Sequence, residues 1–281
     1  MKLIIVFTLF FTINCYAQKQ LPNGYKICLI GDTGTGNKEQ IYVAKALEQE
    51  NCDQVRVLGD VIYEDGIKSS KDEQLKQKFL APYNNLLKNI PFYISLGNHD
   101  YRSNPASWLE VAKEHENIHF PSMYYSDVYE DICLYTLDTN SSFKEQIIWM
   151  GRQILINSTC KFNLSLGHHP FISSGMHKSA SGSLKDFLEQ TAIKHTHAYF
   201  AGHDHQLSDE GKSGKTHLFI SGSGAKLRPL SKNAQVWGVS KLGYMTLVVQ
   251  RSKKEVKLKF DFISVNEKFK RKVEHSGFIT R

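Results

Sequence analysis

The sequence predicts an α/β fold with parallel strands, and three observations support this interpretation. Short apolar runs typical of buried strands alternate with longer amphipathic patterns typical of helices. Most of the apolar runs end in glycine followed by aspartate, asparagine or histidine, as expected where parallel strands end at one edge of a sheet. After residue 202 the pattern changes to a strand-rich tail with turns.

Each expected element follows from a local pattern. Strands are expected at residues 25–31, 54–60, 91–98, 132–138, 162–168 and 197–203. Helices are expected at residues 38–50, 72–89, 142–157 and 183–195, where apolar residues recur with helical spacing. The tail adds strand-like segments at 215–225, 241–251 and 254–265. A strand, a loop and a helix in alternation predict a layered fold.

The first residues are typical of an export signal. A lysine precedes an apolar run from Leu3 to Ile13, and a small residue follows at Ala17. The run is shorter than the roughly 20 residues that cross a bilayer, although an uncleaved anchor or a lipid-modified Cys15 are alternatives. We therefore expect residues 1–17 to be a signal peptide and residues 18–281 to form a single exported domain without a transmembrane segment.

Charge and cysteine content narrow the class of protein. The formal net charge of +7 suits an anionic substrate, but no basic stripe interleaved with aromatic residues predicts a nucleic-acid partner. Cys28, Cys52, Cys133 and Cys160 show no metal-binding spacing. Export permits disulfides. Cys28 and Cys133 lie in apolar runs, however, and are expected to be simple buried residues.

The stretch LIGDTGTGNK, residues 29–38, has two opposed interpretations. A phosphate-binding loop requires GxxxxGK[ST], but Asn37 follows Gly36, so the lysine is displaced and the hydroxyl is missing. The dinucleotide pattern GxGxxG fails too, because the glycines fall at 31, 34 and 36. We therefore interpret Asp32 as a metal-binding residue at a strand end.

The polar residues at the strand ends form a mixed set of oxygen and nitrogen donors. They are Asp32, Asp60, Asn98, His168 and His203. His203 and His205 stand two residues apart, so an extended chain turns both imidazoles to the same side. One such residue alone is usually part of a turn, but five strand ends of matching form predict a shared metal site.

The ordered motifs resemble those of the metallophosphoesterases, and in detail those of purple acid phosphatases of the small, tartrate-resistant type. The motifs are Asp32, GDVIY (59–63), GNHD (97–100), GHHP (167–170) and AGHDH (201–205). The resemblance implies a four-layer α-β-β-α sandwich with mixed sheets and a dimetal site at the carboxyl ends of strands. It also implies a secreted acid phosphatase that acts on phosphate monoesters.

The resemblance carries the ligands over by position. The implied Fe(III) site uses Asp32, Asp60, Tyr63 and His205, and the implied second site, for Fe(II), Zn(II) or Mn(II), uses Asp60, Asn98, His168 and His203. Asp60 would bridge the two ions. Carboxylate and phenolate oxygens suit Fe(III), whereas imidazole and amide suit a divalent ion.

Two further histidines are implied as catalytic residues. His99 and His177 would donate hydrogen bonds to phosphoryl oxygens and protonate the leaving alkoxide, and Asp100 is a candidate to orient His99. The expected reaction is direct attack of a metal-bound hydroxide at acidic pH. His169 replaces an expected aromatic residue, which leaves substrate preference open. The alternatives are a phosphodiesterase or nucleotide hydrolase of the same superfamily and a non-catalytic secreted binding protein, and we expect a monomer.

Overall fold

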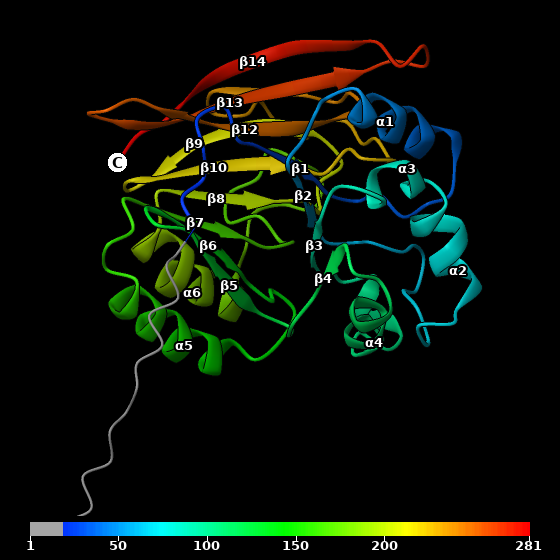
Figure 1. The fold of residues 1–281 in the computed structure, drawn as a ribbon, viewed down its shortest axis with the longest axis horizontal. Coiled ribbons are helices and arrows are strands. Elements are labelled where there is room, and N and C mark those ends of the chain that lie inside the picture. The colour runs from blue at the N-terminus through cyan, green and yellow to red at the C-terminus, as the bar shows by residue number, and fades with distance from the viewer. Residues whose placement is uncertain (1–18) are drawn as a thin grey trace, which may run out of the picture.

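Two seven-stranded sheets lie face to face at the centre of the protein (Figure 1). The computed structural model describes residues 19–281, so the expected signal peptide lies outside the described residues. No helix in the described part combines the length and apolar character needed to span a membrane.

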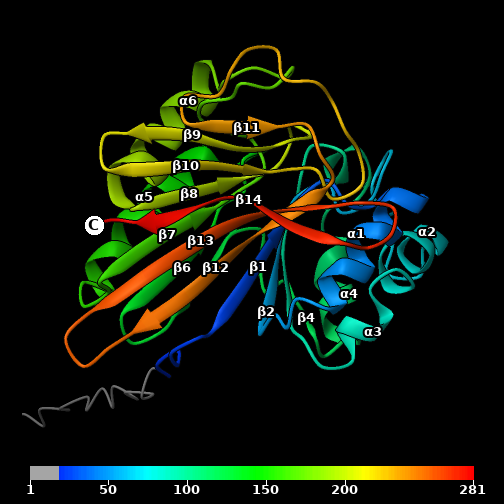
Figure 2. The ribbon, with the colours of Figure 1, turned by 90° about the horizontal axis from the view of Figure 1, so that it is seen from above.

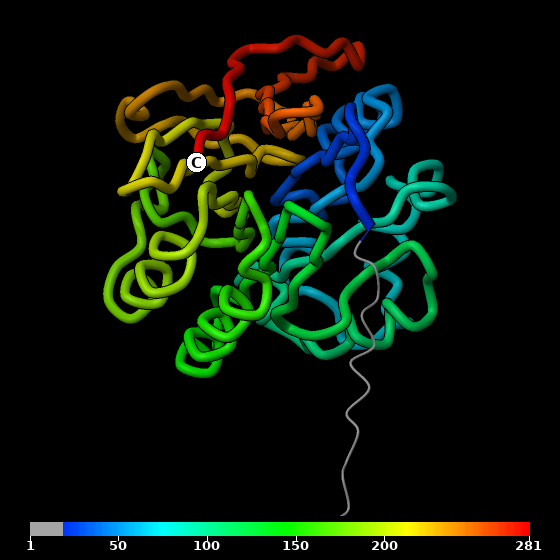
Figure 3. The backbone as a smooth tube through the Cα atoms, turned by 60° about the vertical axis from the view of Figure 1, so that its left-hand side comes forward, coloured from blue at the N-terminus to red at the C-terminus, as the bar shows by residue number. Residues whose placement is uncertain are grey.

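The first sheet combines the start of the described chain with its end. Its strands are β1 (Lys26–Ile30), β2 (Gln54–Leu58), β3 (Phe92–Ser95), β4 (Ile118–His119), β12 (Gly243–Arg251), β13 (Val256–Val265) and β14 (Arg271–Ile279). Their order is β14-β13-β12-β1-β2-β3-β4. β1 to β4 pair in parallel, whereas β12 pairs antiparallel with β1 and continues into an antiparallel meander. Figure 3 shows this last part of the chain, in orange and red, close to the blue segment with which the described chain begins.

The second sheet has the order β11-β9-β10-β8-β7-β6-β5. Its strands are β5 (Tyr125–Val128), β6 (Ile132–Thr136), β7 (Phe162–Leu166), β8 (Ala198–Ala201), β9 (Leu207–Ser213), β10 (Thr216–Ser221) and β11 (Trp237–Val239). β6, β7, β8 and β10 are parallel neighbours, β5 pairs antiparallel with β6, and β9 pairs antiparallel with both β10 and β11. The six expected buried strands and the strand-rich tail are therefore present.

Helices cover the outer face of each sheet (Figure 2). The first sheet carries α1 (Lys38–Glu48), α2 (Glu73–Leu75), α3 (Asn84–Leu87) and α4 (Ser107–Glu114), and the second carries α5 (Phe143–Ile156) and α6 (Gly182–Leu188). α2 and α6 continue as the π-helical segments η1 (Lys76–Leu80) and η3 (Glu189–Ile193), and η2 (Asp100–Arg102) is a 3₁₀ turn. The continuous helix expected over 72–89 is wrong. It is interrupted at residues 81–83, where Pro82 has no N–H to donate.

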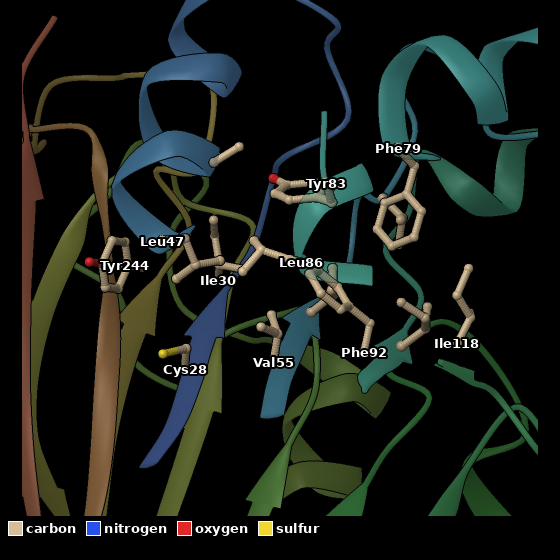
Figure 4. Close-up of a cluster of buried hydrophobic side chains, with 14 of the residues drawn as sticks. Cys28, Ile30, Leu47, Val55, Phe79, Tyr83, Leu86, Phe92, Ile118 and Tyr244 are labelled. Atoms are coloured by element: carbon tan, nitrogen blue, oxygen red, sulfur yellow. The ribbon is translucent and has the colours of Figure 1, made fainter. Parts of the chain in front are cut away.

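Alternating side chains build the layers of the core. In β1, Ile27 and Leu29 enter the apolar layer between the two sheets, while Cys28 and Ile30 pack toward the helices. Figure 4 shows the helix-facing cluster, in which Leu47 of α1 and Leu86 of α3 lie over the first sheet. Smaller clusters join α5 and α6 to the second sheet. The four-layer α-β-β-α sandwich is confirmed.

The cysteines correct one expectation. Cys28 and Cys133 are buried, but each forms a disulfide, with Cys52 and with Cys160 respectively. Both bonds occupy the same place in a strand-helix-strand unit. The helix returns the chain beside its starting strand, so a cysteine just before the second strand meets one within the first. Pairing of this kind depends on strand register, which spacing along the sequence does not reveal.

Candidate metal centre

The strand ends that carry polar residues meet where the two sheets adjoin. Asp32 follows β1, Asp60 follows β2, Asn98 follows β3, His168 follows β7 and His203 follows β8. β1, β2 and β3 are parallel neighbours in the first sheet, and β7 and β8 are parallel neighbours in the second. Each group of strands therefore ends at one edge of its own sheet.

Three of these residues have unusual backbone geometry. Asp32, Asp60 and His203 have φ angles of 58°, 48° and 69°, in the left-handed region that residues other than glycine seldom occupy. Such a conformation costs on the order of 1–3 kcal/mol per residue and persists only where surrounding contacts impose it.

One cluster consists of Asp32, Tyr63 and His205. The Tyr63 hydroxyl donates to Asp32 Oδ1 at 2.8 Å and lies 3.2 Å from His205 Nε2. His205 Nε2 is 3.4 Å from Asp32 Oδ1. The three side chains are buried, and they come from segments on both sheets. They are three of the four residues expected around one ion.

A second cluster consists of Asn98, His168 and His203. His168 Nε2 lies 3.1 Å from Asn98 Oδ1 and 3.1 Å from His203 Nδ1. Asp60 Oδ1 is 3.4 Å from the same His168 nitrogen, and Asp32, Asp60 and His168 offer donor atoms within 4.8 Å of one another. Asp60 is thus the carboxylate between the two clusters. All seven residues expected as metal ligands are brought together.

The donors around His168 fit a cation. His168 Nδ1 lies 2.9 Å from the Leu58 carbonyl oxygen, which only accepts, so Nδ1 carries the ring proton and Nε2 presents a lone pair. Burial also holds the pKa of His168 well below its usual value, which keeps the ring neutral. The facing oxygens of Asn98 and Asp60 present lone pairs as well. These facing lone pairs repel one another, and a cation held among them would turn the repulsion into coordination.

Electrostatics in the first cluster also favour a bound cation. Burial raises the pKa of Asp32 to about 6, although the hydrogen bond and charge of His205 oppose the rise. Burial, followed by the charges of Asp32 and Asp60, holds the pKa of Tyr63 well above its usual value. A metal ion would favour the deprotonated form of both groups. Lys226 lies over the Tyr63 ring, with Nζ 3.6 Å from its centroid, and pairs with Glu64 at 3.1 Å.

Glycine at two strand ends is required by the neighbouring donors. A Cβ atom at Gly97 would lie 2.2 Å from Asp60 Oδ1, and one at Gly59 would lie 2.4 Å from His168 Nδ1. Gly59 also has a φ of 85°. At these two strand ends glycine thus leaves room for a donor from another strand end, namely Asp60 of the same sheet beside Gly97 and His168 of the other sheet beside Gly59.

The two histidines expected to face substrate lie beside the clusters. His99 Nε2 is 3.9 Å from Asp60 Oδ2, and its Nδ1 is 2.6 Å from the Glu64 carbonyl oxygen. The His177 ring centroid is 4.3 Å from that of His203. The expectation that Asp100 orients His99 is wrong. Its carboxylate instead accepts backbone N–H groups from residues 61, 62 and 97, and so ties the two strand ends together.

Sequence reasoning did not identify Asp204. It lies between His203 and His205, and its side chain contacts the segment that carries His177. Its Oδ1 accepts the His177 backbone N–H at 2.9 Å, and its Oδ2 accepts the Ser173 hydroxyl at 2.5 Å. Asp204 is 1% exposed. The sequence signal that could have drawn attention to Asp204 is a carboxylate placed between two histidines expected to be ligands.

The chain is similar to known phosphoesterases. The family model described as calcineurin-like phosphoesterase matches residues 25–207, a range that contains every expected site residue. The chain is 24% identical over 214 residues to tartrate-resistant acid phosphatase type 5 of Mus musculus, covering 66% of this chain and 65% of that protein. It is 26% identical over 274 residues to purple acid phosphatase 7 of Arabidopsis thaliana, covering 84% and 82%. The chain therefore spans just under two thirds of the length of the mammalian relative.

Solved structures share the fold. The structure titled "GAP50 the anchor in the inner membrane complex of Plasmodium" is 20% identical, with a TM-score of 0.77 over 92% of this chain and 89% of that chain. The structure of PhoD is 14% identical, with a TM-score of 0.62 over 94% and 69%. At these identities the likeness concerns the arrangement of strands and helices.

Proposed function

Because the chain belongs to the calcineurin-like phosphoesterase family, we propose that it is an exported acid phosphatase that hydrolyses phosphate monoesters at a pair of metal ions. One observation carries the proposal, namely that two clusters of donors share Asp60. The curated acid phosphatase relatives and the two disulfides support the activity and the export. The single domain over 18–281 and the monomeric state remain predictions.

We assign each cluster of donors to one ion. Asp32, Tyr63 and His205 would hold Fe(III), Asn98, His168 and His203 would hold Fe(II), Zn(II) or Mn(II), and Asp60 would contact both. When bound, such a metal pair supplies charge that neutralises the phosphate and lowers the pKa of water.

The remaining polar groups would bind and protonate the substrate. His99 and His177 stand next to the clusters without belonging to either. The Glu64 carbonyl oxygen accepts the Nδ1 proton of His99, so His99 would donate to a phosphoryl oxygen through Nε2 of its protonated ring, and His177 would donate through its own ring. One of them would protonate the leaving alkoxide. The backbone bond to Asp204 fixes the segment that carries His177, so the donor needs little reorganisation during the reaction.

A non-catalytic role is an alternative, because GAP50 of Plasmodium shares this fold and is described as an anchor. Each of the seven donors of this chain lies 3.4 Å or less from another of them, which favours the enzymatic proposal. A phosphodiesterase remains a second enzymatic alternative, and it is separated by the choice of substrate.

The proposal is tested with protein comprising residues 18–281. We expect about two metal ions per chain, a visible absorption band from Tyr63 bound to Fe(III), and faster hydrolysis at acidic pH of p-nitrophenyl phosphate than of its bis-ester. Tyr63→Phe should abolish the band, whereas Tyr83→Phe, a buried tyrosine in the helix-facing core, should retain it. A colourless, iron-free and fully active enzyme would contradict the Fe(III) assignment, and preference for the bis-ester would contradict the monoesterase assignment.

A further inference from the structure

His169 is a third imidazole beside the clusters, and neither the metal assignment nor the pair of expected catalytic histidines uses it. Its ring centroid lies 4.5 Å from that of His203 and 4.9 Å from that of His168. A ring nitrogen of His169 lies within 4.8 Å of donor nitrogens of both. The His177 ring centroid lies 4.3 Å from that of His203, so His169 and His177 both pack against the ring of His203, one of the expected ligands.

The position of the ring proton on His169 follows from Thr139. The Thr139 hydroxyl oxygen accepts the His169 backbone N–H at 3.1 Å and lies 2.8 Å from His169 Nδ1. Thr139 is 2% exposed, and Nδ1 is the one acceptor recorded within reach of its hydroxyl among residues 19–281. If Nδ1 carried a proton, the Thr139 hydrogen would be buried without a partner. The Thr139 hydroxyl therefore donates to Nδ1, and the ring proton resides on Nε2.

The backbone of His169 is held as firmly as its ring. The Tyr199 hydroxyl donates to the His169 carbonyl oxygen at 2.6 Å, and Tyr199 is 1% exposed. The Nδ1 side of the ring faces buried Thr139, while the residue as a whole is partly exposed. With Nδ1 bonded to Thr139, Nε2 is the ring nitrogen of His169 that has no hydrogen-bond partner recorded among residues 19–281, and the ring packs against His168 and His203.

We propose that His169 is a substrate-binding residue whose Nε2–H donates to a terminal phosphoryl oxygen and selects monoesters over diesters. The inference rests on the proposed function and deepens it. A phosphate monoester dianion has three terminal oxygens and two negative charges, whereas a diester has two terminal oxygens and one negative charge. A further imidazole donor beside His99 and His177 therefore stabilises a bound monoester more than a bound diester. Thr139 is a positioning residue that keeps the donor on Nε2.

Two sets of variants test the proposal. His169→Phe retains a flat ring but removes the donor. Thr139→Val retains the shape of the side chain but removes the hydroxyl that keeps the ring proton of His169 on Nε2. Thr139→Ser keeps the hydroxyl and is the matched control. The measurements are kcat/KM for p-nitrophenyl phosphate and for its bis-ester, binding of inorganic phosphate by calorimetry, and metal content.

For His169→Phe we expect kcat/KM for the monoester to fall about tenfold or more, and phosphate to bind about tenfold more weakly, as for loss of one hydrogen bond to a charged group. The bis-ester should change by less than about threefold, and metal content should be unchanged. Thr139→Val should shift in the same direction by a smaller factor, and Thr139→Ser should resemble the wild type.

Equal losses of kcat/KM on both esters in His169→Phe, or no loss on either, would overturn the inference. Loss of metal from His169→Phe would also overturn it, because His169 would then be a metal ligand. Loss of metal and of both activities in that variant, together with a Thr139→Val enzyme identical to the wild type, would also overturn it. These outcomes differ from failure of the proposed function, in which the wild type itself hydrolyses neither ester or prefers the bis-ester.

Discussion

The two sheets contribute chemically different halves of the candidate metal centre. Loops of the first sheet supply oxygen donors, and loops of the second supply nitrogen donors. The oxygen donors are Asp32, Asp60, Tyr63 and Asn98, and the nitrogen donors are His168, His203 and His205. Each cluster mixes the two kinds, because His205 joins Asp32 and Tyr63, while Asn98 joins His168 and His203.

This difference shows why the site depends on the packing between the sheets. Neither half alone has enough donors around one point for a four-coordinate ion. The apolar layer between the sheets, which includes Leu29, Leu58, Leu166 and Phe200 next to the strand ends, sets the distance between the halves. The apolar core thus determines whether the oxygen and nitrogen donors come close enough to share an ion.

Asp60→Asn should have the largest effect, because it removes the one carboxylate between the two halves. We expect loss of at least one ion per chain and a fall in kcat of about 1,000-fold or more, measured by metal analysis and phosphatase assay. Asp65→Asn is the matched control, since the Asp65 side chain is 72% exposed, and it should retain both ions and activity. An active, fully metallated Asp60→Asn enzyme would remove the basis for a shared centre.

Gly97→Ala should damage the oxygen half without removing a donor. The added Cβ would lie 2.2 Å from Asp60 Oδ1, so the carboxylate must move, and we expect lower metal content and a stability loss of about 1–3 kcal/mol. Gly151→Ala, in α5, adds a Cβ with no atom within 4 Å and should raise stability by about 0.5–1 kcal/mol. Thermal unfolding measures the change in stability of both variants, and metal analysis measures their metal content. Unchanged metal content in Gly97→Ala would contradict the crowded geometry.

The disulfides provide a comparison in which the two sheets should behave alike. Cys28–Cys52 and Cys133–Cys160 close segments of similar length, with sequence separations of 24 and 27. Chain entropy predicts a stability loss of about 3 kcal/mol when either pair is replaced by alanines. Denaturant unfolding of the two double variants should give similar losses. A large loss from one pair and none from the other would show that the two sheets differ in their dependence on the cross-link.

Asp204→Asn should have the smallest effect, because it alters only the support of His177 on the nitrogen half. The amide keeps the shape but loses one acceptor, so we expect kcat to fall about tenfold with metal content unchanged. Asp209→Asn is the control, since that buried carboxylate pairs with His275 in the other sheet. Loss of metal from Asp204→Asn alone would indicate that Asp204 supports the ligands rather than the substrate-facing loop.

Much of the candidate site was predictable because its signals are local. A glycine and a polar residue after an apolar run mark a strand end wherever they occur, and two histidines two residues apart share a side. The interruption at Pro82 also had a local signal, which the amphipathic pattern over 72–89 obscured. The family resemblance then distributed the donors between the two ions.

The remaining features depend on which segments become neighbours. Asp100 lies one residue from His99 in the chain, yet its carboxylate bonds to residues 61 and 62 of another strand end. Cys28 meets Cys52 only through the register of β1 against β2. The proton on His169 is placed by Thr139, 30 residues away.

Residue order alone thus specifies the kinds of donor and the strand ends that carry them, because hydrophobic periodicity and turn chemistry act over a few residues. The packed fold decides how the donors combine, how the cysteines pair and which ring nitrogen of His169 bears the proton. Those outcomes depend on distances of about 3 Å between residues far apart in the chain, and such distances exist only once the two sheets have packed together.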